Sequence, residues 1–367
     1  MLYHLLYPLS KYSIVFNVFR YITFRSIGAF VTALLFVLLA GPPLVKFLKG
    51  QSAVELIDED KPKRHKAKEG TPTMGGLIIL FGLLIASLLW NDLTNRPILM
   101  MYLTAVWLGV LGFLDDYLKN FLKISKGLLP KYKIWGQIGV GLFLTLAIYF
   151  STNVVDNVTQ IQIPFLKNTY LQLGWMFIPI MVIYITGISN AVNLTDGLDG
   201  LAAGVMIFSA LGLGIMSYLK GNYVIANYLK LEFIPTAGEL TVFIAGLIGA
   251  LIGFLWFNAY PAEVFMGDTG SLTLGGILAV LSILLKEQIF FLIIGFLFIA
   301  ETLSVIIQRT HFRYTKKKYG TGKRVFLCAP IHHHFEMKGM HESKIVIRFW
   351  IVATLLLAIG LSTIKLR

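Results

Sequence analysis

The chain has 367 residues, of which 56% are hydrophobic and only 14% are charged. This composition, with repeated apolar runs of about 20 residues, excludes a soluble protein and indicates a single membrane domain over residues 1–367. The net charge of +13 does not indicate nucleic-acid binding, because loop charge asymmetry explains such a surplus in a protein of the lipid bilayer. The single cysteine, Cys328, excludes an intramolecular disulfide framework.

Residues 1–20 do not resemble a cleavable signal, because Lys11, Asn17 and Arg20 interrupt their apolar residues, and we expect an amphipathic segment near the membrane surface. The rest predicts an all-α polytopic membrane protein of about ten transmembrane helices. We expect these at 22–45, 73–90, 97–114, 133–150, 174–192, 201–219, 239–257, 271–286, 288–308 and 345–364. For Glu301, inside the ninth span, a hydrogen-bonded place at a helix break and a direct functional role are equally open.

Most lysine and arginine residues lie in the connections after the first, third and ninth spans. The positive-inside rule therefore places these connections in the cytoplasm and both termini on the outer, periplasmic side. One outer connection alternates over 157–163, and Tyr170–Leu173 suits the returning strand, which predicts a small β-hairpin near 157–173. The absence of a clear internal repeat argues against an inverted-repeat transporter.

The segment Asn193–Gly200 holds two carboxylates, an amide and a hydroxyl between two apolar spans. Charged groups at a membrane edge are costly to keep there, so by default they indicate function. The other connections on the same predicted face carry further polar groups. These are Lys68, Thr71–Gly76, Asp115, Asp116, Asn258, Met266–Ser271 and His332–His334.

The acidic residues of this set also have structural interpretations. Asp115 and Asp116 either end a helix or act in function, and their directions, about 100° apart on a helix, predict divided roles. Asp196 and Asp199 are spaced to share a face of a helical turn, and Asp196 is alternatively the N-cap of the sixth span. Asp268, in a turn before the eighth span, is either an Asx turn with a helix cap or an oxygen ligand for Mg²⁺.

The three consecutive histidines favour an anion-binding loop over a zinc site, since they lack the i, i+4 spacing and have no cysteine at ligand spacing. Carboxylates, lysine and histidine beside hydrophobic helices suit phosphate chemistry on a lipid, in which a metal neutralises phosphate oxygens. Neither a P-loop nor a kinase signature is present, which disfavours ATP-driven chemistry.

Several segments together resemble the polyprenyl-phosphate N-acetylhexosamine-1-phosphate transferases. They are Thr71–Gly76, Asp115–Tyr117, Asn190–Gly200, Phe254–Asn258, Phe265–Asp268 and Ala329–Phe335, in the order of that family. The triple histidine and Pro72–Gly76 favour the branch that acts on an N-acetylmuramoyl-pentapeptide. The resemblance implies transfer of phospho-N-acetylmuramoyl-pentapeptide from UDP-N-acetylmuramoyl-pentapeptide to undecaprenyl phosphate, with release of UMP and with Mg²⁺ as cofactor. It also implies a multi-pass protein of the bacterial inner (cytoplasmic) membrane with a cytoplasmic active site.

The resemblance further implies residue roles. Asp268 would ligate Mg²⁺ with Asp115 and Asp116 close to it, and Asp115 would activate the lipid phosphate. Phe265 would stack on uracil, and a hydrophobic groove near the ninth span would hold the prenyl tail. The substrate-binding residues would be Lys68, Thr73, Asn190, Asn193, Asp196, Asp199, Asn258, Phe265, His332, His333, His334, Lys119, Lys123 and Lys131.

Direct attack by the lipid phosphate is favoured over a covalent aspartate intermediate, because a phosphate monoester is already an oxyanion nucleophile. The alternatives are a sister transferase that uses UDP-N-acetylglucosamine and an ion-coupled transporter. The transporter is disfavoured because most of its candidate acids lie at the membrane edge and not at the midplane. The oligomeric state is left open, with a homodimer as one alternative.

Overall fold

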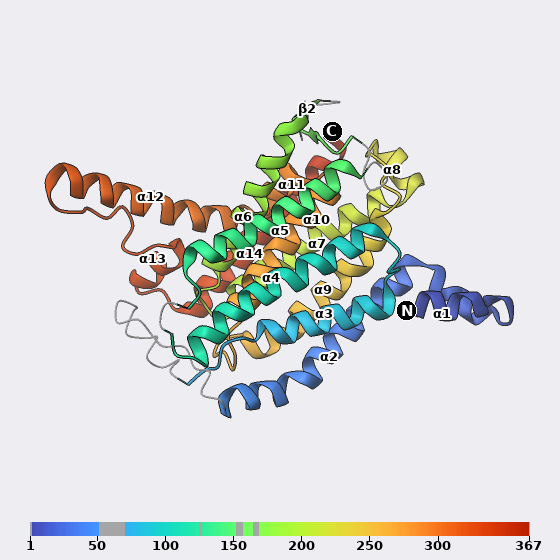
Figure 1. Ribbon diagram of the computed structural model, residues 1–367, viewed down its shortest axis with the longest axis horizontal. Helices are drawn as coiled ribbons and strands as arrows, with labels where there is room; N and C mark the ends of the chain where they lie inside the picture. Colours follow the sequence, from blue (N-terminus) through green and yellow to red (C-terminus); the bar gives the residue numbers. More distant parts are fainter. Residues whose placement is uncertain (1, 51–69, 125–126, 152–156, 164–168, 367) are drawn as a thin grey trace.

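The structure, a computed structural model, describes residues 2–50, 70–124, 127–151, 157–163 and 169–366. It is a bundle of helices in which the described residues form one two-stranded sheet (Figure 1). The long helices are α2 (Ile22–Gly50), α3 (Gly76–Trp90), α4 (Arg96–Asn120), α5 (Pro130–Phe150), α6 (Phe177–Thr195), α7 (Leu201–Lys220), α9 (Ala237–Asn258), α10 (Gly267–Leu284), α12 (Phe296–Tyr319) and α14 (Glu342–Ser362). The shorter helices are α1 (Leu2–Leu6), α8 (Tyr223–Leu229), α11 (Gln288–Ile294) and α13 (Ile331–Met337).

The helices correspond one by one to the predicted spans. In the described parts of the chain, eight helices are long and apolar enough to cross a membrane, and α11 with α12 forms a bent ninth unit. The tenth, α3, is apolar but has only 15 residues. The predicted all-helical, multi-pass membrane fold is therefore confirmed.

The ninth span is not the continuous helix over 288–308 that the hydrophobic run predicts. The chain bends by 76° between α11 and α12, at Gly295. A side chain at Gly295 would press on Phe291, because its Cβ would lie 3.0 Å from the Phe291 carbonyl oxygen. Beyond the bend, α12 projects away from the bundle (Figure 1).

The two ends of the chain contact connections on the same side of the bundle. His4 Nε2 lies 2.8 Å from Asp92 Oδ1 in the α3–α4 connection. Lys365 Nζ lies 5.5 Å from the ring centre of Tyr228 in α8, between α7 and α9. Both ends of the chain thus lie on the side of the bundle opposite the connections that follow the odd-numbered spans, as an even number of spans requires. The assignment of this side of the bundle to the periplasm stays a prediction from the distribution of the basic residues.

The predicted hairpin is present on this same side. It consists of β1 (Gln160–Gln162) and β2 (Tyr170–Gln172), which pair antiparallel with Ile161 opposite Leu171. The strands are shorter than the alternating pattern suggested.

Before α2, the chain forms α1 and two 3₁₀ helices over Tyr7–Lys11 and Ile14–Arg20, with Tyr12 and Ile14 strongly exposed.

Helix α10 lies at the centre of the bundle, and every residue from Thr269 to Leu284 is buried. Its N-terminal end packs closely against α3 and α4 through glycines. A Cβ at Gly76 would lie 2.2 Å from the Gly270 nitrogen, and one at Gly112 would lie 2.4 Å from the Asp268 carbonyl oxygen. Small residues permit such close helix contacts in membrane proteins. These contacts fix the first turn of α10 beside the C-terminal end of α4.

Candidate active site

Asp116 joins α4 to the first turn of α10. Its Oδ1 accepts a hydrogen bond from the Asp268 amide at 3.1 Å, and its Oδ2 accepts bonds from the Thr269 amide at 2.8 Å and the Thr269 hydroxyl at 2.6 Å. A carboxylate is stabilising at a helix N-terminus, where amide groups lack helical partners. Because α10 begins at Gly267, Asp268 lies in its first turn and not in a turn before the helix, as the sequence suggested. Asp116 therefore positions Asp268.

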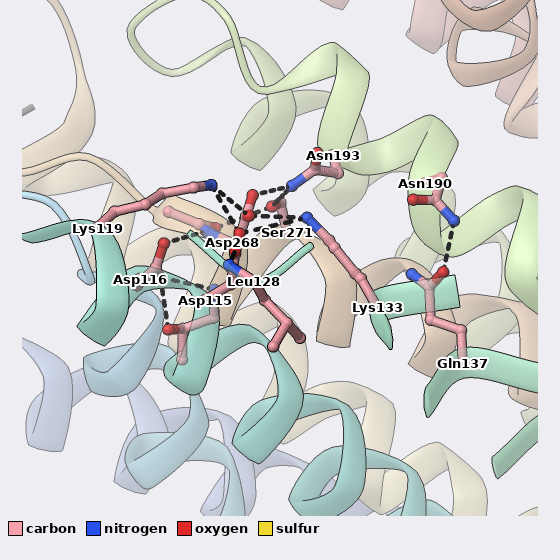
Figure 2. A network of polar contacts seen from close by, with 12 residues as sticks. Asp115, Asp116, Lys119, Leu128, Lys133, Gln137, Asn190, Asn193, Asp268 and Ser271 are labelled. Atoms are coloured by element: carbon pink, nitrogen blue, oxygen red, sulfur yellow. Dashed lines mark hydrogen bonds and ion pairs between the residues drawn. The ribbon is translucent and has the colours of Figure 1, made fainter. Parts of the chain in front are cut away.

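Asp115 and Asp268 share two lysines (Figure 2). Lys119 Nζ lies 2.6 Å from Asp115 Oδ2 and 3.0 Å from Asp268 Oδ2. Lys133 Nζ, from the start of α5, lies 2.7 Å from Asp268 Oδ2 and 3.5 Å from Asp115 Oδ2. Buried charges persist in proteins only when they are paired, and here two ammonium groups compensate two carboxylates.

Further donors fix the remaining oxygens of this pair. The Leu128 amide donates to Asp115 Oδ1 at 2.6 Å. Asn193, near the end of α6, donates from Nδ2 to Asp268 Oδ1 and also to Ser271 Oγ at 2.8 Å. The ends of α4, α5, α6 and α10 thus meet at one polar centre, which we call the aspartate–lysine centre: Asp115, Lys119, Lys133, Asn193 and Asp268.

Asp199 and Asn258 join the loop after α6 to the loop after α9. Asp199 Oδ2 accepts a hydrogen bond from the Ala262 amide at 3.0 Å. Asn258 Oδ1 accepts one from the Gly200 amide at 3.1 Å, and its Nδ2 donates to the Val264 carbonyl at 2.9 Å. Both side chains are buried. They define the shape of this side of the site.

The expected helical arrangement of Asp196 and Asp199 is wrong. Helix α6 ends at Thr195, and the chain is not helical again until α7 begins at Leu201. The two acids therefore do not share a face of a helical turn. Asp196 is the C-cap residue of α6, and Gly200, with φ of 77°, occupies the N-cap position of α7 that Asp196 was considered for.

Phe265 and Thr73 lie on adjoining segments. The Phe265 amide donates to the Pro72 carbonyl at 2.8 Å, and the Gly75 amide donates to the Phe265 carbonyl at 2.8 Å. Thr73 Oγ1 accepts a hydrogen bond from Asn120 Nδ2 at 2.8 Å. This backbone pairing brings the half-buried ring of Phe265 to the same end of the bundle as Asp116.

Other predicted residues lie outside the aspartate–lysine centre. Asn190 is one turn earlier in α6 and donates to Gln137 Oε1 at 2.8 Å, apart from the central contacts in Figure 2. Lys131 Nζ lies 4.9 Å from the ring centre of the adjacent tyrosine, and Lys123 is exposed in the loop after α4. Lys68 falls outside the residues that the structure describes.

The three histidines make three different contacts. His332 is fully buried, and its Nε2 approaches Gly197, where a Cβ would lie 2.3 Å away. His333 Nδ1 lies 2.9 Å from Glu336 Oε2, and His334 Nδ1 accepts a hydrogen bond from the Leu327 amide at 3.1 Å.

The donor set fits a magnesium ion only in part. Within the described ranges, no three His, Cys, Asp or Glu side chains are arranged to hold a metal by themselves. Asp116 uses its oxygens to bind the first turn of α10. Asp115 Oδ2 and Asp268 Oδ2, however, face the same two ammonium groups. Two carboxylates completed by substrate phosphates are a usual environment for Mg²⁺.

Lys133 is the main residue of this centre that was absent from the predicted site. Pro130 is a sequence signal for the start of α5, because proline is favoured in the first turn of a helix. From that start, Lys131 and Lys133 point about 200° apart, at 100° per residue. Only one of them can face the bundle, and in the structure it is Lys133.

Comparison with known proteins matches residues 98–286 to the model of glycosyl transferase family 4. Residues 68–80 match the phospho-N-acetylmuramoyl-pentapeptide-transferase signature 1. A phospho-N-acetylmuramoyl-pentapeptide-transferase of Citrifermentans bemidjiense is 47% identical over 371 residues and covers 100% of both chains. One from Flavobacterium johnsoniae is 44% identical over 392 residues, with 96% of each chain covered. One from Chlorobium limicola is 45% identical over 351 residues, with 96% of this chain and 95% of the relative covered. The chain therefore belongs to the phospho-N-acetylmuramoyl-pentapeptide-transferase family, within glycosyl transferase family 4.

Proposed function

We propose that the protein transfers phospho-N-acetylmuramoyl-pentapeptide from its UDP carrier to undecaprenyl phosphate, forming lipid I, the first membrane-bound intermediate of peptidoglycan synthesis. The observation that carries this proposal is the pair Asp115 and Asp268, bridged by Lys119 and Lys133 at the end of membrane-spanning helices. Opposite charges that share contacts at a helix bundle end suit the handling of phosphate groups beside a lipid. Full-length relatives named phospho-N-acetylmuramoyl-pentapeptide-transferase support the identity of the transferred group.

The reaction proceeds by direct attack in this proposal. A phosphate oxygen of the lipid forms a bond to the β-phosphorus of the UDP-sugar. The bond between that phosphorus and the bridging oxygen breaks, and UMP leaves with the oxygen. Asp115 accepts the proton when the lipid phosphate arrives singly protonated, and no covalent enzyme intermediate is needed.

Lys119 and Lys133 act on the phosphates. Lys119 is 39% exposed and can turn its ammonium group from a carboxylate to an incoming phosphate oxygen. Lys133 is more enclosed and keeps Asp268 in place. Charge-assisted contacts to phosphate stabilise the negative charge that develops on the leaving UMP. Asp268 and Asp115 would hold Mg²⁺, which neutralises phosphate oxygens when bound.

The remaining predicted residues surround this centre. Phe265 stacks on uracil, and Asp199, Asn258, Thr73 and Lys68 shape the uridine side. Asn193, Asp196 and Asn190 lie on the nucleotide-sugar side, and His332 to His334 organise the phosphate or sugar end. Lys123 and Lys131 attract phosphates to the loop. The prenyl tail lies along α12, whose Leu303, Ile306 and Ile307 are exposed. The site faces the cytoplasm from the inner membrane.

The test uses purified protein in detergent with UDP-N-acetylmuramoyl-pentapeptide, undecaprenyl phosphate and Mg²⁺. UMP release and the mass of the lipid product are measured together. We expect both products with the muramoyl donor and neither when the lipid is omitted. UMP release only with UDP-N-acetylglucosamine would assign the chain to the sister activity, and no release with either donor would contradict a transferase function.

A further inference from the structure

We infer that Glu301 is a positioning residue that holds His332 against the loop after α6, within the segment Asn193–Gly200, and so couples helix α12 to the nucleotide-sugar side of the site. The kinetic part of this inference rests on the proposed function, whereas its structural part does not. Glu301 lies in α12, six residues after the bend at Gly295, and its side chain is fully buried.

Glu301 fixes the start of α13. The Ile331 amide donates to Glu301 Oε2 at 2.7 Å. The N-cap residue of α13, Pro330, has no side chain able to accept a hydrogen bond. The first amide of this helix therefore finds its acceptor on a different helix, as the first amides of α10 do with Asp116.

The same carboxylate contacts the imidazole of His332. Glu301 Oε2 lies 3.2 Å from His332 Nδ1, with both side chains fully buried. Their geometry is not that of a hydrogen bond, and neither ring nitrogen has a hydrogen-bond partner among the described residues. A carboxylate beside one ring nitrogen still favours the tautomer and the orientation that place the N–H toward it. Among the described residues, Glu301 is the only carboxylate within 4.0 Å of either ring nitrogen, and the ring of His333 also contacts His332, with the two ring centres 4.2 Å apart.

The opposite edge of His332 lies against the loop. A Cβ at Gly197 would lie 2.3 Å from Nε2 and 2.9 Å from Cε1 of His332. The ring occupies the space that any side chain at position 197 would need. Because Gly197 lies between Asp196 and Asp199, a displaced ring would change the path of the loop that carries both acids. The order of contacts is Glu301, His332, Gly197.

The first test is Glu301→Gln, which keeps the size of the side chain and an acceptor for the Ile331 amide but removes the charge beside His332. We expect faster hydrogen–deuterium exchange in peptides that cover Asn193–Gly200, measured by mass spectrometry without substrate. We also expect kcat for UMP release to fall by about 10- to 100-fold, the usual cost of a small misplacement. The KM for undecaprenyl phosphate should stay within about 3-fold of its original value, which is a change of under 1 kcal/mol in binding free energy. The reason is that Glu301 is fully buried, whereas the prenyl tail is proposed to lie along the exposed residues of α12.

Glu336→Gln is the matched control. Glu336 is also a carboxylate beside an imidazole of α13, since its Oε2 lies 2.9 Å from His333 Nδ1. Its carboxylate lies beside His333 and not beside His332, so it is one contact further from Gly197, with the centres of the two imidazole rings 4.2 Å apart. Exchange in the loop peptides should therefore rise much less than in Glu301→Gln. Equal acceleration in both variants would overturn the inference, because it would reflect a general loosening of α13.

Gly197→Ala tests the other end of the contact. Its methyl group enters the space of the His332 ring, so the loss of kcat should resemble that of Glu301→Gln. In the double variant the loss should not exceed the larger single loss, because both changes break one chain of contacts. Losses that multiply would overturn the coupling. Gel filtration and the thermal midpoint establish that each variant is folded.

The two proposals fail in different ways. Unchanged exchange in the loop of Glu301→Gln would overturn the positioning role even if the protein is an active transferase. A selective rise in the KM for undecaprenyl phosphate would overturn it too, because Glu301 would then serve lipid binding. A protein without UMP release would contradict the proposed function and leave the exchange comparison valid.

Discussion

The two ends of the helix bundle both contain buried charges, but they pair them differently. At the end away from the site, Arg25 binds Glu239 with two nitrogens, each to its own oxygen, at 2.6 and 2.9 Å. Lys220 lies 2.7 Å from Glu287, and both side chains are 1% exposed. At the site, one oxygen of Asp268 contacts two lysines, and one of them, Lys119, is 39% exposed.

This difference separates closed ion pairs from exchangeable ones. A bidentate or fully enclosed pair cannot release a charge without leaving it unpaired in a medium of low polarity. An oxygen shared by two ammonium groups keeps one partner when the other moves to a phosphate. Burial alone therefore does not mark the functional end of the bundle. The functional end is marked instead by a carboxylate oxygen that two lysines share, one of which is accessible to solvent.

The largest expected effect comes from Asp268→Ala. It removes the carboxylate that both lysines share, and we expect the rate of UMP release to fall on the order of 10⁴-fold at every Mg²⁺ concentration. Chelation of Mg²⁺ with EDTA should stop the unaltered enzyme in the same assay, with recovery when Mg²⁺ is returned. Substantial activity of the variant would remove Asp268 from the reaction.

The closed end of the bundle should respond in stability and not in chemistry. Glu287→Gln leaves Lys220 buried without its carboxylate, and we expect a loss of about 3–5 kcal/mol in the free energy of unfolding. This loss should lower the thermal midpoint of unfolding in detergent. The kcat of the folded fraction should stay close to that of the original protein. A large fall in kcat with an unchanged midpoint would contradict the division between the two ends.

Lys133→Ala compared with Lys131→Ala sharpens the role of the shared oxygen. We expect a fall in kcat of about 10²-fold for Lys133, the size typical of one lost charge-stabilising donor. Lys131 contacts Tyr132 and not the aspartates, so its variant should lose far less. Initial rates of UMP release under saturating substrates decide between them, and equal losses would show that general positive charge matters more than position.

The smallest expected effect concerns the uracil contact. Phe265→Ala should weaken the binding of UMP by about 1–3 kcal/mol, the range measured for base stacking on an aromatic ring. Isothermal titration with UMP measures this change. The kcat at saturating substrate should fall less than the affinity. Unchanged affinity would place uracil elsewhere in the site.

The sequence predicted most of the architecture because hydrophobic length is a strong signal in membrane proteins. Asp115, Asp116, Asn193 and Asp268 were also predicted as neighbours, since motifs and charge orientation placed them on one face. The different contacts of Asp115 and Asp116 agree with the divided roles expected for adjacent residues on a helix. The pairing of Asp116 with the first amides of α10 needed the relative position of two helices.

Three features depended on local geometry that the residue pattern does not contain. The bend at Gly295 lies inside a continuous apolar run, where one glycine is common and a break is not required. Pro130 indicates where α5 begins, but whether Lys131 or Lys133 faces the centre depends on how α5 packs against the other helices. Asp196 and Asp199 have helical spacing, but the chain leaves α6 at Thr195 to reach α7 through a non-helical turn.

The short helix α3 has a consequence for how a lipid reaches the site. Its 15 residues span only about 22 Å at 1.5 Å per residue, less than the roughly 30 Å of a bilayer core. Such hydrophobic mismatch draws the bilayer inward or leaves one end of the helix below the headgroups. That helix starts at Gly76, directly after the segment paired with Phe265. On the proposed function, an acceptor phosphate at this end of α3 would lie close to the hydrocarbon, so that its prenyl chain need not be lifted out of the bilayer to react.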